Sequence, residues 1–374
     1  MPRSALLVLA ALFAAPLSAQ TRVCMSGDVT LGSNLDPAWA RTAARELYER
    51  WGVSAEPDSL LAPLRPLVAD ADLLLVNVEG AIGTGRAPRK CGPGSTACYA
   101  FRMPTRAAAA FRALAREDAA VVGNVANNHA RDAGNEGLAA TRRHLERAGV
   151  HVTGIDTLAT PVPLASGDTI ALLGFYTSRD TPDARDLAAV RRHVERAVMR
   201  WGTVIVSAHI GAEGNGAQRT FDRREIFLGR IDRGNPVAFA RTAIEAGATL
   251  VWGHGPHVLR AAEWRDEQLV FYSLGNTLTY GPFSNGEPKN RGALACATID
   301  SARHVSMAEL RSTEQLAPGV VRPDSTARAA WLVDSLSRLD FPRTGVRVDP
   351  EGRITKAADI EPQAQAPRRA RPRI

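Results

Sequence analysis

Residue types that commonly bind metal ions follow five apolar, strand-like runs of this sequence. They are Asp28; Asn77 and Glu79; Asn127, Asn128 and His129; His209 with Glu213; and His254 and His257. Imidazole and carboxylate groups together suit divalent ions such as manganese, iron or zinc. One carboxylate, for example that of Glu79, can bridge two ions about 3.5–4 Å apart, and such a pair can hold a water and stabilise a phosphoryl or acyl centre.

These residues divide into predicted metal ligands and predicted catalytic groups. His209 or Glu213 could act as general base or acid, and the neutral amide of Asn128 could ligate or donate to an oxyanion without adding charge. We predict one or two metal ions, held by Asp28, Glu79, Asn128, His129, His209, His254 and His257.

Each residue alone also has a structural explanation. Asp28 could hydrogen-bond its own turn, Glu79 could be a solvated loop charge, and His129 could donate to a backbone carbonyl. Asp132 is interpreted as the N-cap of the following helix. His144, His151, His193 and His304 are expected on helix faces or at strand edges, outside the site. The coincidence at five equivalent strand ends favours the metal site.

The elements that must position these residues alternate along the chain. Apolar strand-like runs cover 22–27, 71–80, 119–129, 169–176, 203–211 and 249–257, and amphipathic helical patterns cover 134–149, 186–202 and 235–248. This alternation predicts a layered α/β domain with mostly parallel strands. The carboxyl ends of such strands meet at one sheet edge, where ligands bind. Further strands at 268–276, 292–299 and 304–312, without long helices between them, predict an antiparallel portion before a helix at 325–339.

The ends of the chain differ in character from this central part. Residues 1–19 combine Arg3 with an apolar run of about eleven residues, which is typical of a cleaved signal peptide. We therefore expect an exported protein, periplasmic or extracellular, with an uncleaved N-terminal anchor as the alternative. The domain is predicted at 21–355, and 356–374 is predicted to be a disordered basic tail.

Composition limits the partners, and cysteine spacing limits the disulfides. The net charge is +7, but four arginines lie in the last nine residues, so no nucleic-acid surface is expected. Cys91 and Cys98 flank a turn-rich insert and are predicted to form a disulfide. Cys24 and Cys296 lie in strand-like runs and are predicted to be buried hydrophobic residues.

Eight ordered segments resemble the CapA proteins of poly-γ-glutamate capsule biosynthesis, whose domain is similar to calcineurin-like metallophosphoesterases. They lie at 26–32, 73–82, 99–104, 124–138, 145–155, 204–214, 243–264 and 269–278, and include "NVANNHARDAGNEGL" and "LVFYSLGNTL". The resemblance implies a single-domain, four-layer α-β-β-α sandwich with a metal cleft at the strand ends. It carries Asp28, Glu79, Asn128, His129, His209, Glu213, His254 and His257 over as motif residues, and it allows Asn276 to shape the cleft floor.

The sequence also departs from the family pattern. Gly255 stands where family members usually have a second histidine, and Ile210 stands where a tryptophan is usual. No Asp-x-His occurs at the first motif, and Glu79 occupies the position of a bridging aspartate. If the missing imidazole were a ligand, one metal site would be weakened here.

Three functions are consistent with these observations. The first is an exported CapA-like protein that acts in synthesis, release or attachment of an anionic polymer of the poly-γ-glutamate type, as a metal-dependent hydrolase or transferase. Its partners would be the polymer or its precursor and membrane-bound capsule synthesis proteins. The second is a non-catalytic polymer-binding or export module. The third is a general exported metallophosphoesterase.

Overall fold

The computed structural model describes residues 20–32, 37–84, 99–281 and 286–357 of the 374-residue chain. The predicted signal peptide, the Cys91–Cys98 pair and all but the first two residues of the predicted tail lie outside these residues. Among the described residues, no helix combines the length and apolar character needed to cross a bilayer.

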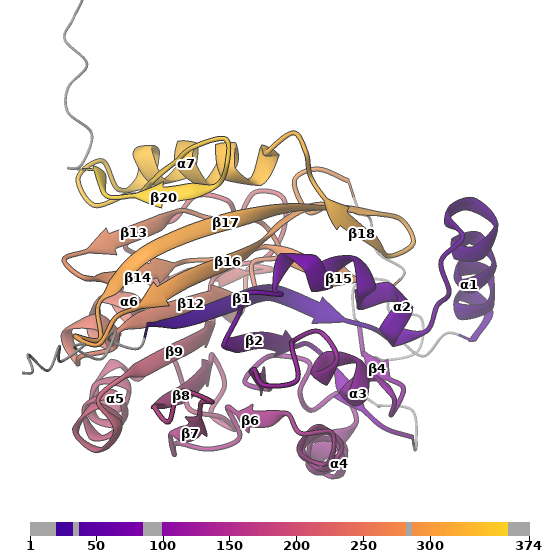
Figure 1. Ribbon diagram of the computed structural model, residues 1–374, viewed down its shortest axis with the longest axis horizontal. Helices are drawn as coiled ribbons and strands as arrows, with labels where there is room; N and C mark the ends of the chain where they lie inside the picture. Colours follow the sequence, from indigo (N-terminus) through magenta and orange to yellow (C-terminus); the bar gives the residue numbers. More distant parts are fainter. Residues whose placement is uncertain (1–19, 33–36, 85–98, 282–285, 358–374) are drawn as a thin grey trace, which may run out of the picture.

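Two β-sheets form the centre of the molecule (Figure 1). The ten-stranded sheet has the order β19-β20-β17-β16-β1-β2-β5-β6, with β15 paired to β1 and β18 to β17. The bounds of its strands are β1 Thr21–Thr30, β2 Leu73–Val78, β5 Ala120–Asn124, β6 His151–Thr153, β15 Asn276–Thr279, β16 Arg291–Ile299, β17 Val305–Leu316, β18 Val320–Pro323, β19 Arg347–Val348 and β20 Arg353–Thr355.

The six-stranded sheet has the order β13-β14-β12-β9-β8-β7. Its strands are β7 Thr160–Pro163, β8 Thr169–Tyr176, β9 Val204–His209, β12 Leu250–His254, β13 Ala262–Arg265 and β14 Gln268–Phe271. Two small pairs complete the strands, β3 Ala81–Ile82 with β4 Arg102–Met103, and β10 Ile226–Phe227 with β11 Ile231–Asp232.

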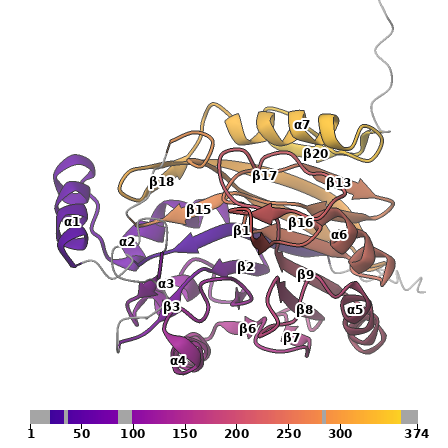
Figure 2. The ribbon, with the colours of Figure 1, turned by 180° about the vertical axis from the view of Figure 1, so that it is seen from behind.

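Helices cover the outer faces of both sheets (Figure 2). On the ten-stranded side lie α2 Pro57–Leu61, the 3₁₀ helix η1 Ala62–Leu67, α3 Ala107–Arg112 and α4 Gly134–Arg147, whereas α1 Pro37–Trp51 stands apart at one end of the molecule. On the six-stranded side lie α5 Leu187–Trp201 and α6 Pro236–Glu245, and α7 Arg328–Asp340 packs along β17, β19 and β13. The side chains of Asp186 and Asn235 cap α5 and α6 by accepting from backbone N–H groups of the first turn.

Three apolar clusters account for this layering. One lies between the sheets and joins residues such as Met25 and Leu75 to Leu172 and Trp252. A second packs the ten-stranded sheet against α2, α3 and α4, and a third packs the six-stranded sheet against α5 and α6. The four-layer α-β-β-α arrangement expected from the resemblance is therefore confirmed.

Strand direction follows the prediction closely. β1, β2, β5 and β6 are mutually parallel, as are β8, β9, β12 and β14, whereas β16 and β17 form the expected antiparallel portion. β14 differs from the prediction, since the sequence places the run at 268–276 in the antiparallel portion. It pairs antiparallel with β13 only, and parallel with β12.

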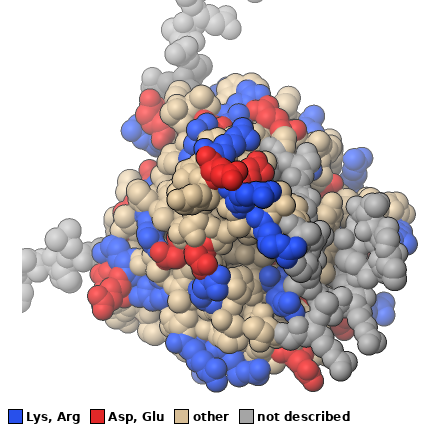
Figure 3. All heavy atoms as spheres, turned by 90° about the vertical axis from the view of Figure 1, so that its right-hand side faces the viewer, with Lys and Arg blue, Asp and Glu red and all other residues tan. Residues whose placement is uncertain are grey.

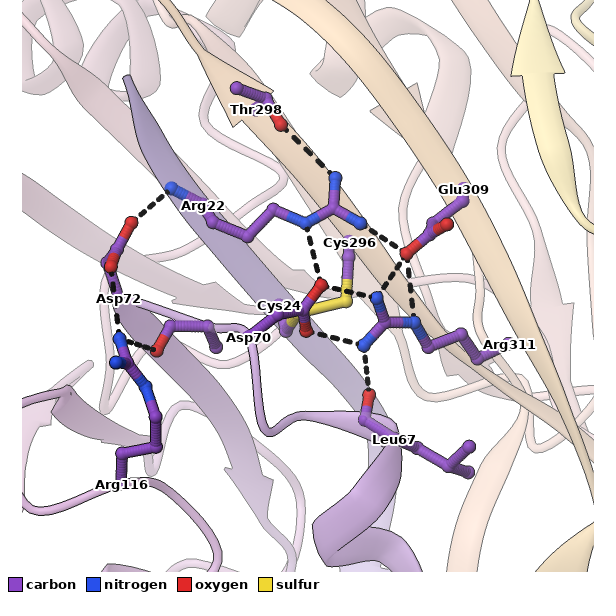
Figure 4. The surroundings of a disulfide bond; sticks show 11 residues. Arg22, Cys24, Leu67, Asp70, Asp72, Arg116, Cys296, Thr298, Glu309 and Arg311 are labelled. Carbon is purple, nitrogen blue, oxygen red and sulfur yellow. Dashed lines mark hydrogen bonds and ion pairs between the residues drawn. A yellow bond between two sulfur atoms is a disulfide. The ribbon is translucent and has the colours of Figure 1, made fainter. Parts of the chain in front are cut away.

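Cys24 and Cys296 are completely buried, as predicted, but their assignment as hydrophobic residues without a bond is wrong, because they form a disulfide between β1 and β16. The two residues face one another in the antiparallel register, with Cα atoms 4.0 Å apart. Arg22, Asp70, Glu309 and Arg311 surround the bond with ion pairs (Figure 4).

Candidate metal centre

The acids and imidazoles of the two sheets meet where their central strands end. Asp28 lies near the end of β1, and Glu79 directly follows β2. His209 and His254 are the last residues of β9 and β12 and are direct neighbours in the parallel register. Because the two sheets pack face to face with these strands central, their carboxyl ends form one edge. The predicted convergence of these residues is observed.

Two candidate ligand groups lie at this edge, and the first contains Asp28, His209 and His254. The Nδ1 atoms of the two histidines are 2.9 Å apart, and Oδ1 of Asp28 lies 3.7 Å and 3.8 Å from them. Two nitrogen ligands 2.1 Å from one ion are separated by about 3.0 Å at an octahedral angle and by about 3.4 Å at a tetrahedral one. The spacing of the two imidazoles therefore suits a single divalent ion.

The second group contains Asp28, Glu79 and His257. Oδ2 of Asp28 is 3.0 Å from Nδ1 of His257, and Oε1 of Glu79 is 3.7 Å from Nε2 of the same ring. Asp28 thus belongs to both groups, one oxygen facing each. Oε1 of Glu79 also lies 3.9 Å from Nε2 of His209, and the bridging role suggested for Glu79 by the sequence stays a prediction.

Burial and charge keep the first group ready to ligate. Asp28, His209 and His254 are at most 1 % exposed. Nε2 of His209 faces Oε1 of Glu79 at 3.9 Å, toward the second group, and has no hydrogen-bond partner among the described residues. Burial lowers the pKa of His254 to about 4 and that of His209 well below its usual value. Both rings are therefore neutral near pH 7, which is the form that binds metal. The donor set and its protonation fit a divalent ion.

The charges around His257 also favour a cation. Burial opposes its protonation, but Glu79, Asp28 and Glu213 together raise its pKa to about 10. Burial likewise opposes ionisation of Asp28, yet His257 and His254 lower the pKa of that carboxyl overall. The acids that stabilise this imidazolium would stabilise a metal ion in the same place.

A chain of amides orients Asp28. Asn77 donates to Oδ1 of Asp28 at 2.7 Å, and its own side-chain oxygen accepts from Asn124 at 2.9 Å and from Asn127 at 3.1 Å. Sequence reasoning listed Asn77 and Asn127 as potential ligands and missed Asn124, which ends β5. Their observed hydrogen bonds hold the carboxylate in position.

His129 lies beside the two groups and belongs to neither of them. Its Nδ1 is 2.6 Å from Oδ2 of Asp132, and its ring stacks on Phe101 with centroids 4.0 Å apart. The prediction that Asp132 caps the next helix is wrong: the N-cap of α4 is Ala133, and Asp132 is 2 % exposed and contacts His129 instead. Asn128 is half-buried next to His129, and its role as a ligand stays a prediction.

Glu213 is held by an arginine that sequence reasoning did not identify. Arg233, which is 3 % exposed, forms an ion pair with Oε1 of Glu213, and Oε2 of that residue is 3.8 Å from Nε2 of His257. Arg233 directly follows the β10–β11 hairpin, twenty residues after Glu213, so the sequence holds no short-range pattern that would predict this ion pair. The pairing fixes the carboxylate at the mouth of the site.

A cavity of about 260 Å³ opens beside the second group. Glu79, His129, Glu213 and His257 lie on one part of its wall, and Tyr99, Phe101 and Phe227 form an aromatic part. Asn276 also lines it and contacts Nδ1 of His257 at 3.0 Å, as expected for a residue at the cleft floor.

On the face shown in Figure 3, acidic and basic side chains are interspersed among the described residues, with no extended patch of one sign.

Gly255 leaves room for the ring of His209. Its φ is +110°, and a Cβ there would lie 3.0 Å from Cδ2 of His209. A histidine at this position would therefore require the His209 ring to move. Both ligand groups assemble without the imidazole that the family usually has at this position.

A family model and individual relatives match this chain. Residues 22–280 match the family model described as "Bacterial capsule synthesis protein PGA_cap". The PGA biosynthesis protein CapA of Bacillus subtilis is 27% identical over 169 residues, which cover 41% of this chain and 41% of that protein. The Sinorhizobium fredii protein y4sH is 32% identical over 129 residues, covering 32% of this chain and 25% of its own length.

The matched region thus spans well under half of each of these relatives. Among solved structures, a candidate 5′-nucleotidase from Staphylococcus aureus in complex with α-ketoglutarate matches with a TM-score of 0.44 and 11% identity. That match covers 82% of this chain and 54% of the other. A TM-score at this level supports no conclusion about function.

Proposed function

Because the chain belongs to the bacterial capsule synthesis protein PGA_cap family, we propose that it acts on an anionic capsule polymer of the poly-γ-glutamate type through a divalent-metal cleft. The family supports a role in capsule polymer synthesis. Our proposal is more specific: the protein hydrolyses or transfers the polymer or its precursor in a metal-dependent reaction.

One observation carries this assignment: Asp28 is common to two ligand groups that join both sheets. A divalent ion held there would polarise a carbonyl or phosphoryl oxygen and lower the pKa of a bound water. Asp28, His209 and His254 would hold one ion, and Asp28, Glu79 and His257 would hold a second.

The remaining residues would bind substrate and move protons. His129 lines the cavity with its ring oriented by Asp132, so it is placed to give a proton to a leaving group. Glu213, paired with Arg233, is less suited to act as a free base, because its charge is already compensated. We assign Glu213 to positioning and His209, which is completely buried, to metal binding.

Export is part of the same proposal. A disulfide between Cys24 and Cys296 supports an oxidising compartment, since such bonds are rare in the cytosol. Synthesis proteins bound to the membrane remain the predicted partners.

The test is turnover of poly-γ-glutamate and of p-nitrophenyl phosphate by the purified protein, with Mn²⁺ and with chelator. We expect polymer cleavage or transfer that chelator abolishes, and loss of turnover by more than about a hundredfold in His209→Ala combined with His254→Ala. Polymer binding without turnover under any metal condition would contradict catalysis. Turnover of the aryl phosphate alone would contradict the polymer assignment.

A further inference from the structure

Lys289 lines the cavity beside the second ligand group and has no ion-pair partner among the described residues. It is one of only three lysines in a chain with 46 lysines and arginines. Nearby arginines are already neutralised: Arg233 pairs with Glu213, and Arg291 pairs with Glu287, Glu314 and Asp324. Lys289 is therefore a half-buried cation on the cavity wall whose charge no described acid offsets.

The backbone of Lys289 is fixed relative to the metal-binding residues. Its N–H donates to the carbonyl of Gly286 at 3.0 Å, and its carbonyl accepts from Nδ2 of Asn276 at 3.3 Å. The side-chain oxygen of Asn276 in turn lies 3.0 Å from Nδ1 of His257. One amide thus links the backbone of Lys289 to a candidate metal ligand.

The size and lining of the cavity limit what can bind. Its volume of about 260 Å³ is below the roughly 300–1,000 Å³ of pockets for drug-sized ligands, so it fits one unit of a polymer better than a long stretch. Tyr99, Phe101 and Phe227 provide an apolar wall for a methylene chain. The ammonium of lysine is a compact point charge that can pair with a single carboxylate.

We propose that Lys289 forms an anion subsite that binds the free carboxylate of one acidic unit while the neighbouring acyl group faces Glu79, His129 and His257. This inference rests on the proposed function for the identity of the ligand. It adds a specificity residue outside the metal-binding residues, namely the group that distinguishes a charged unit from a neutral one.

The test measures equilibrium binding by calorimetry on the full chain, with Mn²⁺ and again with chelator. The probes are a γ-linked glutamate trimer and the same trimer with its α-carboxylates converted to carboxamides. The variants are Lys289→Met and Lys289→Arg. The matched control is Lys356→Met, since Lys356 pairs with Glu267 and lies outside this cavity. Thermal unfolding of each variant verifies that it is folded.

We expect Lys289→Met to bind the acidic trimer about tenfold more weakly, as for loss of one charge-assisted hydrogen bond, and to bind the amidated trimer like wild type. Lys289→Arg should stay within about threefold of wild type, and Lys356→Met should be unchanged. Equal losses for both trimers, no loss for either, or no binding of the acidic trimer by wild type would overturn the subsite. The subsite would also be overturned if inorganic phosphate bound in a Lys289-dependent manner while binding of the acidic trimer did not depend on Lys289.

This readout separates the two proposals. A Lys289-dependent preference for the acidic trimer without any turnover would contradict the catalytic function and support the subsite. Metal-dependent turnover by wild type, with unchanged trimer binding in Lys289→Met, would support the catalytic function and contradict the subsite.

Discussion

Oδ1 of Asp28, on the ten-stranded sheet, lies 3.7 Å from Nδ1 of His209, on the six-stranded sheet. Both side chains are completely or almost completely buried. The candidate metal centre is therefore built across the contact between the two sheets. Any change that shifts one sheet against the other should alter metal binding before it unfolds the chain.

Asp132 should matter for turnover without mattering for metal content. Asp132→Asn keeps the size of the side chain but removes the charge that faces Nδ1 of His129. We expect turnover to fall at least tenfold and its pH profile to change, because the imidazole loses the group that fixes its tautomer. Metal content, measured by mass spectrometry, should stay at the wild-type value. A variant that loses metal in proportion to activity would show that Asp132 supports the ligands instead.

Gly255→Ala should weaken metal binding through the His209 ring. The new Cβ would lie 3.0 Å from the ring, and the positive φ adds strain of about 1–2 kcal/mol. Gly167→Ala is the matched control, because Gly167 also has a positive φ, +91°, but has no atom within 4 Å of the added Cβ. Titration with Mn²⁺ should show weaker binding in Gly255→Ala only. Equal affinities in the two variants would refute the steric account.

The disulfide should contribute substantially to stability. Cys24 and Cys296 are 272 residues apart, so the bond restricts a long loop of the unfolded chain. We expect Cys24→Ala with Cys296→Ala to lower the free energy of unfolding by about 2–5 kcal/mol in urea titrations. Reductant should reproduce the effect in wild type and have a smaller effect in the double variant, where only the predicted Cys91–Cys98 bond is left to reduce. Free thiols at both positions in the protein purified without reductant would contradict the bond.

Acid should remove the contribution of Asp70. Hydrogen bonds from Arg311 lower the pKa of Asp70 from 3.8 to about 2, so the unfolded chain takes up a proton there first. The stabilisation is fully present above pH 3.8 and is lost as the pH falls toward 2. Because the side chain is about half exposed, the effect is below about 1 kcal/mol.

The measurement for Asp70 is thermal unfolding of Asp70→Asn and wild type from pH 7 to pH 3. We expect a difference in melting temperature at pH 7 that shrinks below pH 4. Asp118→Asn, a change at an exposed surface carboxylate, serves as the control. A difference that is independent of pH would contradict the ionic origin.

Strand ends could be predicted because hydrophobic periodicity and parallel pairing are local signals. The runs at 71–80 and 203–211 contain β2 and β9, and their polar ends gave Glu79 and His209. The helix α1 at Pro37–Trp51 was not identified. Its sequence is no more polar on average than those of α4 and α5, which were predicted, but its apolar residues are less concentrated on one face. The short strands β6 and β7 were missed for the same kind of reason, since three or four residues show no clear alternation.

Contacts between distant side chains could not be predicted. The Cys24–Cys296 bond depends on β16 lying next to β1 in a defined register, which the order of the runs does not fix. The same is true of Arg233 with Glu213 and of Lys289 in the cavity. Asp132 was misassigned because an acid before a helix is usually a cap, whereas here the hydrogen bond to His129 takes precedence.

The most direct test of the metal centre is the divalent-metal content of the purified full chain and two variants, read by mass spectrometry after dialysis. Asp28 belongs to both ligand groups and His257 to one. We predict two ions per wild-type chain, one in His257→Ala and none in Asp28→Ala, with all three proteins folded by circular dichroism. A folded wild-type chain that retains no divalent ion, or an Asp28→Ala chain that retains as many ions as wild type, would contradict the account.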